Sequence, residues 1–157
     1  MAPDSMSFPF WHSERVRFRD VDLQHIVYYG KYLDYFDNAL YEYLRSLGFD
    51  TGEIDERHGF DTSVVRAEID YRAPARFDEL LRIGVRITRL GNSSFDTMYE
   101  VQNERGVVCS AKLILVNYDA RSGKARQIPA GIRDAIEQSN AGATPSEESS
   151  DARLEGV

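Results

Sequence analysis

The sequence predicts an α+β fold in which one long, mostly buried helix packs against a five-stranded antiparallel sheet. Residues 29–47 place apolar side chains at steps of three and four, which is the period of a helix. Four later stretches alternate apolar and polar residues, which is the period of a half-buried strand. A single sheet can cover so apolar a helix only by curling around it, so we expect the helix inside and the sheet outside.

The first part of the chain is predicted to contain a loose arm, a strand and the long helix. Residues 1–13 form the arm, in which we expect Phe8, Phe10 and Trp11 to pack against the body or a partner subunit. Residues 14–19 read as a strand, and Gly48 is the predicted stop of the helix. The apolar stripe of this helix consists of Tyr29, Leu33, Phe36, Leu40, Tyr43 and Leu47.

The second part of the chain is predicted to supply four strands and a short helix. The strands cover residues 62–72, 79–90, 94–102 and 107–118. In the first of them, Val65, Ala67, Ile69 and Tyr71 are expected to share one face. Residues 50–61 are predicted to be a loop with a helical turn, and 129–138 a short helix. Residues 14–138 then form the folded domain, and 139–157 a disordered acidic tail.

The composition narrows the class of protein. The net charge of −7 argues against a nucleic-acid partner, and no apolar run is long enough to span a membrane. The N-terminus lacks the layout of a signal peptide, and the one cysteine, Cys109, fits a reducing compartment. We therefore expect a cytoplasmic protein in which Cys109 is buried and inert.

Two carboxylates, Asp20 and Asp22, directly precede the long helix. The first backbone amides of a helix lack partners within it, so a carboxylate in this position often serves as a cap. Asp22 lies several residues before the helical pattern begins, which is further than a cap usually sits. The residues alone therefore leave two roles open for these carboxylates, helix capping and catalysis.

Residues 20–36, D-V-D-L-Q-H-I-V-Y-Y-G-K-Y-L-D-Y-F, resemble the signature of the 4-hydroxybenzoyl-CoA thioesterase-like family of hotdog-fold acyl-CoA thioesterases. The similarity continues through I-D-Y-R-A-P-A-R-F-D-E-L-L to about Ile136. It implies the hotdog fold, Asp22 as the catalytic carboxylate, and a backbone amide of Tyr29, or alternatively Tyr28, as oxyanion donor. It also implies a homodimer or homotetramer with the site at the subunit boundary. One departure is His25, which stands where the family usually has glycine.

The remaining motifs favour the same chemistry. The chain has no serine-nucleophile, dinucleotide or phosphate-loop motif, and its three histidines and one cysteine are too scattered for a metal site, so no cofactor is expected. Asp22 can act on a thioester as nucleophile or as general base, and both routes stay open. Asp20 is read as structural. The predicted substrate-binding residues are His25, Tyr28 and Tyr32 for the acyl group and Arg89, Ser93 and Ser94 for CoA.

The leading hypothesis is thus an acyl-CoA thioesterase for an aromatic or short to medium acyl group. One alternative is a thioesterase acting on acyl-carrier protein. An acidic carrier would prefer a basic patch near the site. The tail accounts for −3 of the net charge of −7, so residues 1–138 carry −4, which argues mildly against this alternative. The other alternative is a non-catalytic acyl-CoA-binding protein.

Overall fold

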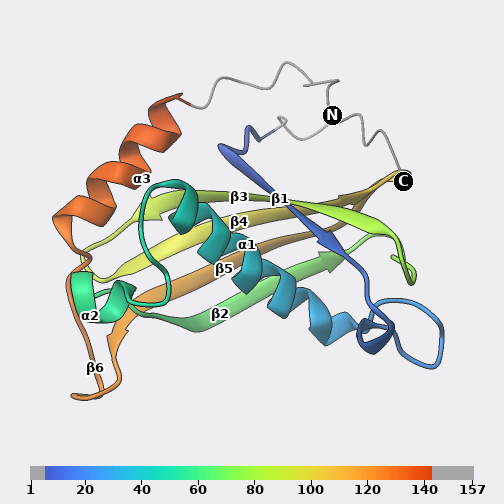
Figure 1. Cartoon of the computed structure of the whole chain (residues 1–157), viewed down its shortest axis with the longest axis horizontal. Helices are drawn as coiled ribbons and strands as arrows, with labels where there is room; N and C mark the ends of the chain where they lie inside the picture. Colours follow the sequence, from blue (N-terminus) through green and yellow to red (C-terminus); the bar gives the residue numbers. More distant parts are fainter. Residues whose placement is uncertain (1–5, 143–157) are drawn as a thin grey trace.

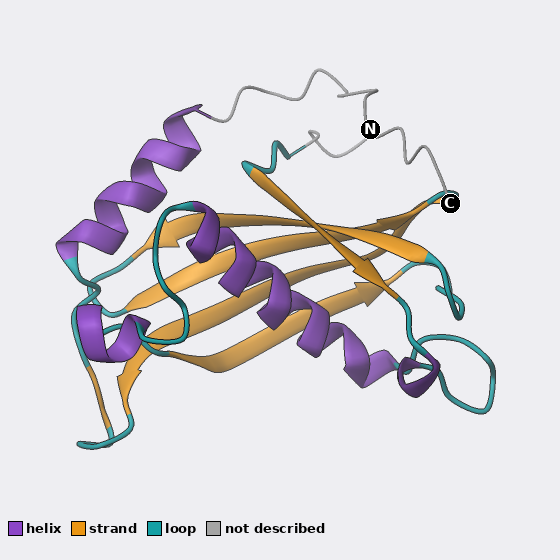
Figure 2. Ribbon diagram, in the orientation of Figure 1, coloured by secondary structure: helices purple, strands orange, loops and turns teal. Residues whose placement is uncertain are grey.

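The long helix α1, Tyr32–Ser46, lies diagonally across one face of an antiparallel sheet (Figures 1 and 2). The computed structural model describes residues 6–142, and the strand order is β1-β3-β4-β5-β2. The strands are β1 Phe10–Arg15, β2 Thr62–Tyr71, β3 Leu80–Leu90, β4 Ser94–Asn103, β5 Gly106–Asp119 and the two-residue β6 Lys124–Ala125. The helices are α1, α2 Ile54–His58 and α3 Ala130–Gly142, with single 3-10 turns at Phe18–Asp20 and Tyr29–Lys31.

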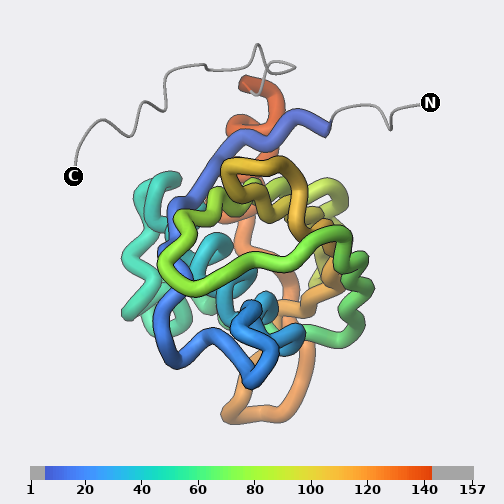
Figure 3. Tube along the Cα trace, turned by 90° about the vertical axis from the view of Figure 1, so that its right-hand side faces the viewer, coloured from blue at the N-terminus to red at the C-terminus, as the bar shows by residue number. Residues whose placement is uncertain are grey.

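The sheet curls around α1, as the end-on view shows (Figure 3). The predicted inner faces of β3 and β4 are confirmed, because every side chain that was predicted to face inward is buried. They are Leu81, Ile83, Val85 and Ile87 from β3 and Phe95, Thr97, Tyr99 and Val101 from β4. Phe36 of α1 stacks on Tyr99 at 4.6 Å between ring centroids. The predicted α+β architecture, with a helix wrapped by five strands, is therefore confirmed.

Both ends of α1 follow from local chemistry. Gly48 takes φ +97°, a left-handed conformation that costs glycine little, and it ends the helix as predicted. At the other end, Tyr29–Lys31 forms a 3-10 turn rather than part of the α-helix, closed by the Lys31 amide on the Tyr28 carbonyl at 2.9 Å. Such tight turns are frequent where an α-helix begins without a capping side chain.

The first strand differs from its predicted position. Residues 14–19 were expected to be the strand, but β1 covers Phe10–Arg15 and pairs with β3 from Val85 to Leu80. Phe18 is 83% exposed in a 3-10 turn, so the alternation of Val16 and Phe18 did not mark a buried face. Part of the predicted arm is consequently a strand of the sheet.

The aromatic residues of the N-terminal segment pack against the body, as expected. Phe10 contacts Tyr43 of α1 on the inner face, at 5.7 Å between ring centroids. Phe8 and Trp11 contact each other beside Gly84 of β3, where a Cβ atom would approach Phe8 to 2.8 Å. Glycine is therefore the residue that lets this segment lie close to the sheet.

Strand β2 is an edge strand with a bulge. The register with β5 shifts between Val64 and Arg66, so Val64 lies opposite Leu115 and shares the inner face with Ala67. The expectation that Val65 shares this face is wrong, because the bulge removes Val65 from the alternation. Val65 is 63% exposed, and the outer edge of β2 is unpaired within the described residues.

The C-terminal helix is longer than predicted. α3 extends to Gly142, so residues 139–142 of the predicted tail are helical, while 143–157 lie outside the described residues. Ile132 and Ile136 are buried, and the Asn140 side-chain amide donates to the Ile87 carbonyl of β3 at 2.8 Å. These contacts fasten α3 to the sheet.

Candidate active site

The segment before α1 folds into a tight hairpin that presents Asp22. Val21 pairs with Val27, and the Asp22 amide donates to the Ile26 carbonyl at 3.0 Å. One oxygen of the Asp22 carboxylate, Oδ1, accepts the Gln24 amide at 2.7 Å, an Asx turn. The other oxygen has no hydrogen-bond partner among residues 6–142. Asp22 therefore does not cap α1.

His25 occupies the one position of this hairpin that needs a left-handed backbone. Its φ is +61°, and its amide donates to the Asp22 carbonyl at 2.9 Å. Glycine takes this conformation without strain, which explains why the similar family usually has glycine there. Histidine is one of the side chains that tolerates the left-handed region, so the hairpin retains its form.

Replacing His25 by glycine is expected to leave the hairpin intact and raise the free energy of unfolding by up to about 1 kcal/mol. The gain is limited because glycine also gives the unfolded chain more freedom. His25→Val should lower stability, because a β-branched residue resists positive φ. Urea unfolding of the three proteins measures both effects, and a His25→Val protein as stable as wild type would contradict the backbone argument.

Asp20 is buried and holds the base of the hairpin. Its Oδ2 accepts the Arg17 amide at 2.8 Å and the Tyr35 hydroxyl of α1 at 2.9 Å, and the Lys31 ammonium lies 3.3 Å from its Oδ1. Burial disfavours the charged form, but these three donors together outweigh it and lower the pKa of Asp20 below its usual value. The predicted structural role of Asp20 fits this geometry.

The lowered pKa of Asp20 predicts a pH-dependent contribution to stability. A carboxylate with a depressed pKa in the folded state stabilises the protein above its unfolded pKa and loses that contribution as the pH falls through the folded value. Asp20→Asn should therefore cost about 2 kcal/mol at pH 7, and the difference from wild type should narrow below pH 3.8. Urea unfolding across pH tests this, and a constant difference would argue against a charged Asp20.

The amides of Tyr29 and Gly30 point out of the helix start without an acceptor. The Tyr28 amide donates to the Asp20 carbonyl at 2.9 Å and the Lys31 amide to the Tyr28 carbonyl, both within the backbone. Between them, the amides of Tyr29 and Gly30 find no partner in the part of the chain that the structure describes. Free amides at a helix start attract negative charge, which is the requirement for an oxyanion donor.

A cavity of about 440 Å³ brings these parts together. Asp22, Tyr29 and Tyr32 line it with Gln24, Ile26, Val27, Tyr71, Arg72, Ala73 and Pro74. Tyr71 at the end of β2 donates its hydroxyl to the Tyr29 carbonyl at 2.7 Å, which fixes the turn above the cavity. The residues from Tyr71 to Pro74 were not predicted as site residues, although they lie in the second segment that carries the family resemblance.

The interior beneath this cavity is apolar and unreactive. Burial raises the pKa of Tyr32, which stays a neutral phenol with its ring 5.6 Å from that of Tyr71. Burial also raises the pKa of the Cys109 thiol to about 12, so that thiol is inert, as expected.

The other predicted substrate residues lie outside this cavity. His25 and Tyr28 are exposed and do not line it, so their role in binding the acyl group stays a prediction. Ser94 pairs with Val116 beside the Thr62 end of β2, whereas the cavity adjoins Tyr71 at the other end. The length of β2 separates these ends by about 30 Å. Arg89 also lies at the Ser94 end, where it donates to Asp96 at 2.7 Å and to Ser94 at 3.1 Å.

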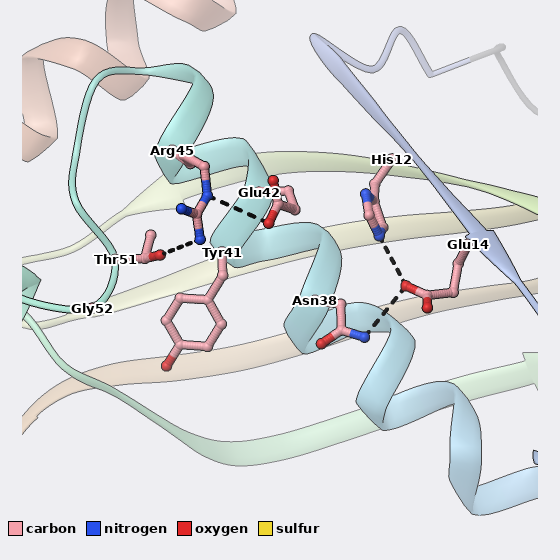
Figure 4. Close-up of a pocket in the computed structure, with 8 residues that line it drawn as sticks. All are labelled: His12, Glu14, Asn38, Tyr41, Glu42, Arg45, Thr51 and Gly52. Atoms are coloured by element: carbon pink, nitrogen blue, oxygen red, sulfur yellow. Dashed lines mark hydrogen bonds and ion pairs between the residues drawn. The ribbon is translucent and has the colours of Figure 1, made fainter. Parts of the chain in front are cut away.

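A second cavity, about 540 Å³, lies between β1, α1 and the loop after α1 (Figure 4). His12 and Asn38 point toward Glu14, and Arg45 bridges Glu42 and Thr51. Its charged groups are already paired with one another. The smaller cavity beside Asp22 is therefore the candidate active site.

Comparison with known proteins identifies the family to which the chain belongs. Residues 16–136 match the thioesterase-like superfamily, so the chain belongs to that superfamily. Its relatives and structural neighbours bear the names of thioesterases and thioester hydrolases. The chain is 32% identical over 120 residues to the acyl-CoA thioester hydrolase YbgC of Escherichia coli, covering 75% of this chain and 88% of that one.

Two further similarities show the range of the family. The 1,4-dihydroxy-2-naphthoyl-CoA hydrolase of Synechococcus is 29% identical over 135 residues, covering 83% of this chain and 91% of that protein. A thioesterase from Thermus thermophilus, solved with coenzyme A and Zn, superposes with a TM-score of 0.74 at 27% identity, covering 86% and 96% of the two chains. The predicted hotdog fold is confirmed by these likenesses.

Among residues 6–142, no three His, Cys, Asp or Glu side chains converge to hold a metal ion. In the same residues no helix is both long and apolar enough to cross a bilayer.

Proposed function

We propose that the protein hydrolyses acyl-CoA thioesters, with Asp22 as the catalytic carboxylate and the backbone amide of Tyr29 as oxyanion donor. The observation that carries this proposal is that a free carboxylate oxygen and a free helix-start amide belong to residues lining one cavity. The names of the relatives support CoA as the thiol.

The chemistry needs only these groups and water. As general base, Asp22 takes a proton from water while the hydroxide adds to the thioester carbonyl. The resulting oxyanion accepts hydrogen bonds from the Tyr29 amide, joined by that of Gly30, an effect worth about 3 kcal/mol per donor. Collapse of the intermediate breaks the C–S bond and releases CoA thiolate, which takes up the proton.

The second route begins with attack by Asp22 itself. The carboxylate oxygen adds to the carbonyl, thiolate leaves, and a mixed anhydride forms on Asp22. Water then cleaves the anhydride to release the acid and restore the carboxylate. Hydrolysis in ¹⁸O water under single turnover distinguishes the routes, because only the anhydride route can place ¹⁸O in the Asp22 carboxylate.

The lining of the cavity favours an aromatic or medium-length acyl group. Ile26, Val27 and the rings of Tyr29, Tyr32 and Tyr71 supply apolar contact. One relative acts on a naphthoyl thioester, which is an acyl group of this kind. The preferred acyl group should therefore be aromatic or of medium length rather than a long straight chain.

A homodimer through β2 would complete the site. The exposed edge of β2 can pair with the same edge of a second copy about a two-fold axis. Because that axis reverses the strand direction, the Ser93–Ser94 end of one subunit would lie beside Asp22 of the other, bringing the predicted CoA-binding residues near the cavity. Sedimentation equilibrium tests this arrangement, and an active species of only 17.9 kDa would contradict it.

The function is tested by measuring free thiol released from benzoyl-, hexanoyl- and palmitoyl-CoA. We expect turnover without added cofactor and the highest kcat/KM for the aromatic or medium substrate. Tight binding of these thioesters without any thiol release would instead identify a non-catalytic acyl-CoA-binding protein.

A further inference from the structure

The turn at the start of α1, residues 28–31, carries its two free amides without a capping side chain, and we call it the oxyanion turn. Neither Tyr28, which precedes the 3-10 turn, nor Lys31, which precedes α1, supplies a side-chain cap. Amides stabilise an oxyanion well only if they are already aimed at it, because turning them during the reaction would cost free energy. Another contact must therefore fix their direction.

The carbonyl group in each peptide plane shows what fixes each amide. A trans peptide group is planar, so its carbonyl oxygen and its N–H point in opposite directions and turn together. The Tyr29 amide shares its plane with the Tyr28 carbonyl, which accepts the Lys31 amide at 2.9 Å. The Gly30 amide shares its plane with the Tyr29 carbonyl, which accepts the Tyr71 hydroxyl at 2.7 Å. The backbone thus fixes the first donor, and a side chain from β2 fixes the second.

The bond from Tyr71 also makes the Gly30 amide a better donor. Its length of 2.7 Å between the two oxygens is that of a well-formed O–H···O hydrogen bond. A carbonyl that accepts a hydrogen bond polarises its peptide group, which leaves the N–H of that group more positive. The same contact therefore sets the direction of this donor and its strength.

Tyr71 is itself held firmly. It is the last residue of β2, where it pairs with Cys109 of β5, and the following Arg72 amide donates to the Val108 carbonyl at 2.9 Å. Its ring meets that of the buried Tyr32 edge to face at 5.6 Å between centroids. β2 ends beside the start of α1 (Figure 1), so the hydroxyl reaches the oxyanion turn from the sheet.

A second series of contacts holds the other side of the oxyanion turn. The Tyr28 amide donates to the Asp20 carbonyl at 2.9 Å, and the Asp20 carboxylate accepts the Tyr35 hydroxyl at 2.9 Å. The Tyr35 ring meets the Tyr32 ring at 5.9 Å between centroids, and Tyr32 contacts Tyr71. These contacts form a closed ring, so the oxyanion turn is held by Asp20 on one side and by Tyr71 on the other.

We propose that Tyr71 is a positioning residue for thioester hydrolysis, whose hydroxyl aims the Gly30 amide at the oxyanion that forms beside Asp22. This inference rests on the proposed function and adds a residue of the sheet to the reaction. Tyr71 donates to a backbone carbonyl and transfers no proton. Its effect should therefore appear in the transition state, where negative charge develops, and not in the binding of the substrate.

A role for Tyr71 in packing alone predicts a different result. Its side chain also lines the cavity and is half exposed, so the ring could act only as a wall for the acyl group. Tyr71→Phe separates the two roles, because it keeps the ring and removes the hydroxyl. A substitution of Gly30 would be less direct, because a Cβ atom there would lie 2.9 Å from the Tyr28 ring.

The test measures kcat and KM for benzoyl-CoA from the release of free thiol. In Tyr71→Phe, kcat should fall roughly tenfold while KM stays within about twofold of wild type, which is the pattern of a lost transition-state interaction. Tyr41→Phe is the matched control, since it makes the same change on a side chain that lines the second cavity, and it should leave both constants unchanged. Thermal unfolding of both variants checks that the fold persists.

The pH dependence supplies a readout that packing alone would not change. Partial burial, with Cys109 and Tyr29 nearby, raises the pKa of the Tyr71 phenol, so wild type keeps this donor at neutral pH. In 3,5-difluorotyrosine at position 71 the phenol has a lower pKa, and a phenolate cannot donate. The kcat of that protein relative to wild type should fall toward the Tyr71→Phe value as the pH rises through this pKa. The other ionisable groups around the phenol and its cavity are the same in both proteins and cancel in the ratio: Asp22, Tyr28, Tyr29, Tyr32, Arg72 and Cys109.

Three results would overturn this inference. The first is a wild-type kcat in Tyr71→Phe, and the second is a rise in KM alone, which would make Tyr71 a binding residue. The third is a difluorotyrosine protein that follows the wild-type pH profile. Failure of the proposed function looks different, because wild type itself would then release no thiol from any of the three acyl-CoAs, and the inference would fall with it.

Discussion

Asp22→Asn is expected to lower kcat/KM for the best acyl-CoA by about 10³-fold, within the range of 10²–10⁴ typical of a lost general base. Asparagine retains the oxygen that accepts the Gln24 amide at 2.7 Å, so the hairpin should keep its shape. What disappears is the negative charge, and with it both the base and the nucleophile. Thiol release from the same acyl-CoA panel measures the loss.

The control for this substitution is Asp50→Asn. Asp50 also accepts an amide two residues ahead, that of Gly52 at 3.1 Å, but it follows the far end of α1. The two variants therefore make the same chemical change in the same kind of turn, and only Asp22→Asn should lose activity. An Asp22→Asn enzyme that keeps more than a tenth of wild-type kcat/KM would move the catalytic role to another carboxylate.

The elements that could be predicted from the sequence are those whose periodicity reflects burial on one face. α1, β3 and β4 each have one face against the core, so their apolar residues recur with the period of the element. Gly48 could be predicted as the end of α1 because positive φ there follows from local sterics. Such features require no knowledge of distant residues.

The wrong predictions concern elements whose position is set by tertiary contacts. The alternation around Val16 and Phe18 resembles a strand, but β1 is set by pairing with β3 and begins at Phe10. The bulge at Val65 depends on the register with β5, which the pattern of β2 alone does not reveal. Neither feature leaves a local signal in the sequence.

The candidate site likewise has one part that follows from local sequence and another that depends on tertiary contacts. Asp22 and Tyr29 are close in sequence, so the hairpin and the helix start bring them together locally. Tyr71 and Arg72 reach the cavity only because β2 runs back past the helix start.

Asn117→Ala is expected to lower the free energy of unfolding by about 3 kcal/mol, because it leaves several buried groups without partners. Asn117 of β5 is fully buried. Its oxygen accepts the Asp61 amide at 3.0 Å and Arg126 Nε at 3.2 Å, and its nitrogen donates to the carbonyls of Gly59 at 3.0 Å and Gln127 at 3.1 Å. One side chain thus joins β5 to the loop before β2 and to the segment before α3.

The matched substitution is Asn92→Ala, in the exposed β3–β4 turn, where only the backbone carbonyl is used, as acceptor for the Ile128 amide at 2.8 Å. It should change stability by no more than about 0.5 kcal/mol. Urea unfolding at neutral pH compares the two.

Asn117→Asp should also be destabilising, because a carboxylate cannot donate to the two carbonyls and would place a negative charge against them. Equal stability of Asn117→Ala and wild type would show that water replaces the amide, and would remove Asn117 as the link between these loops.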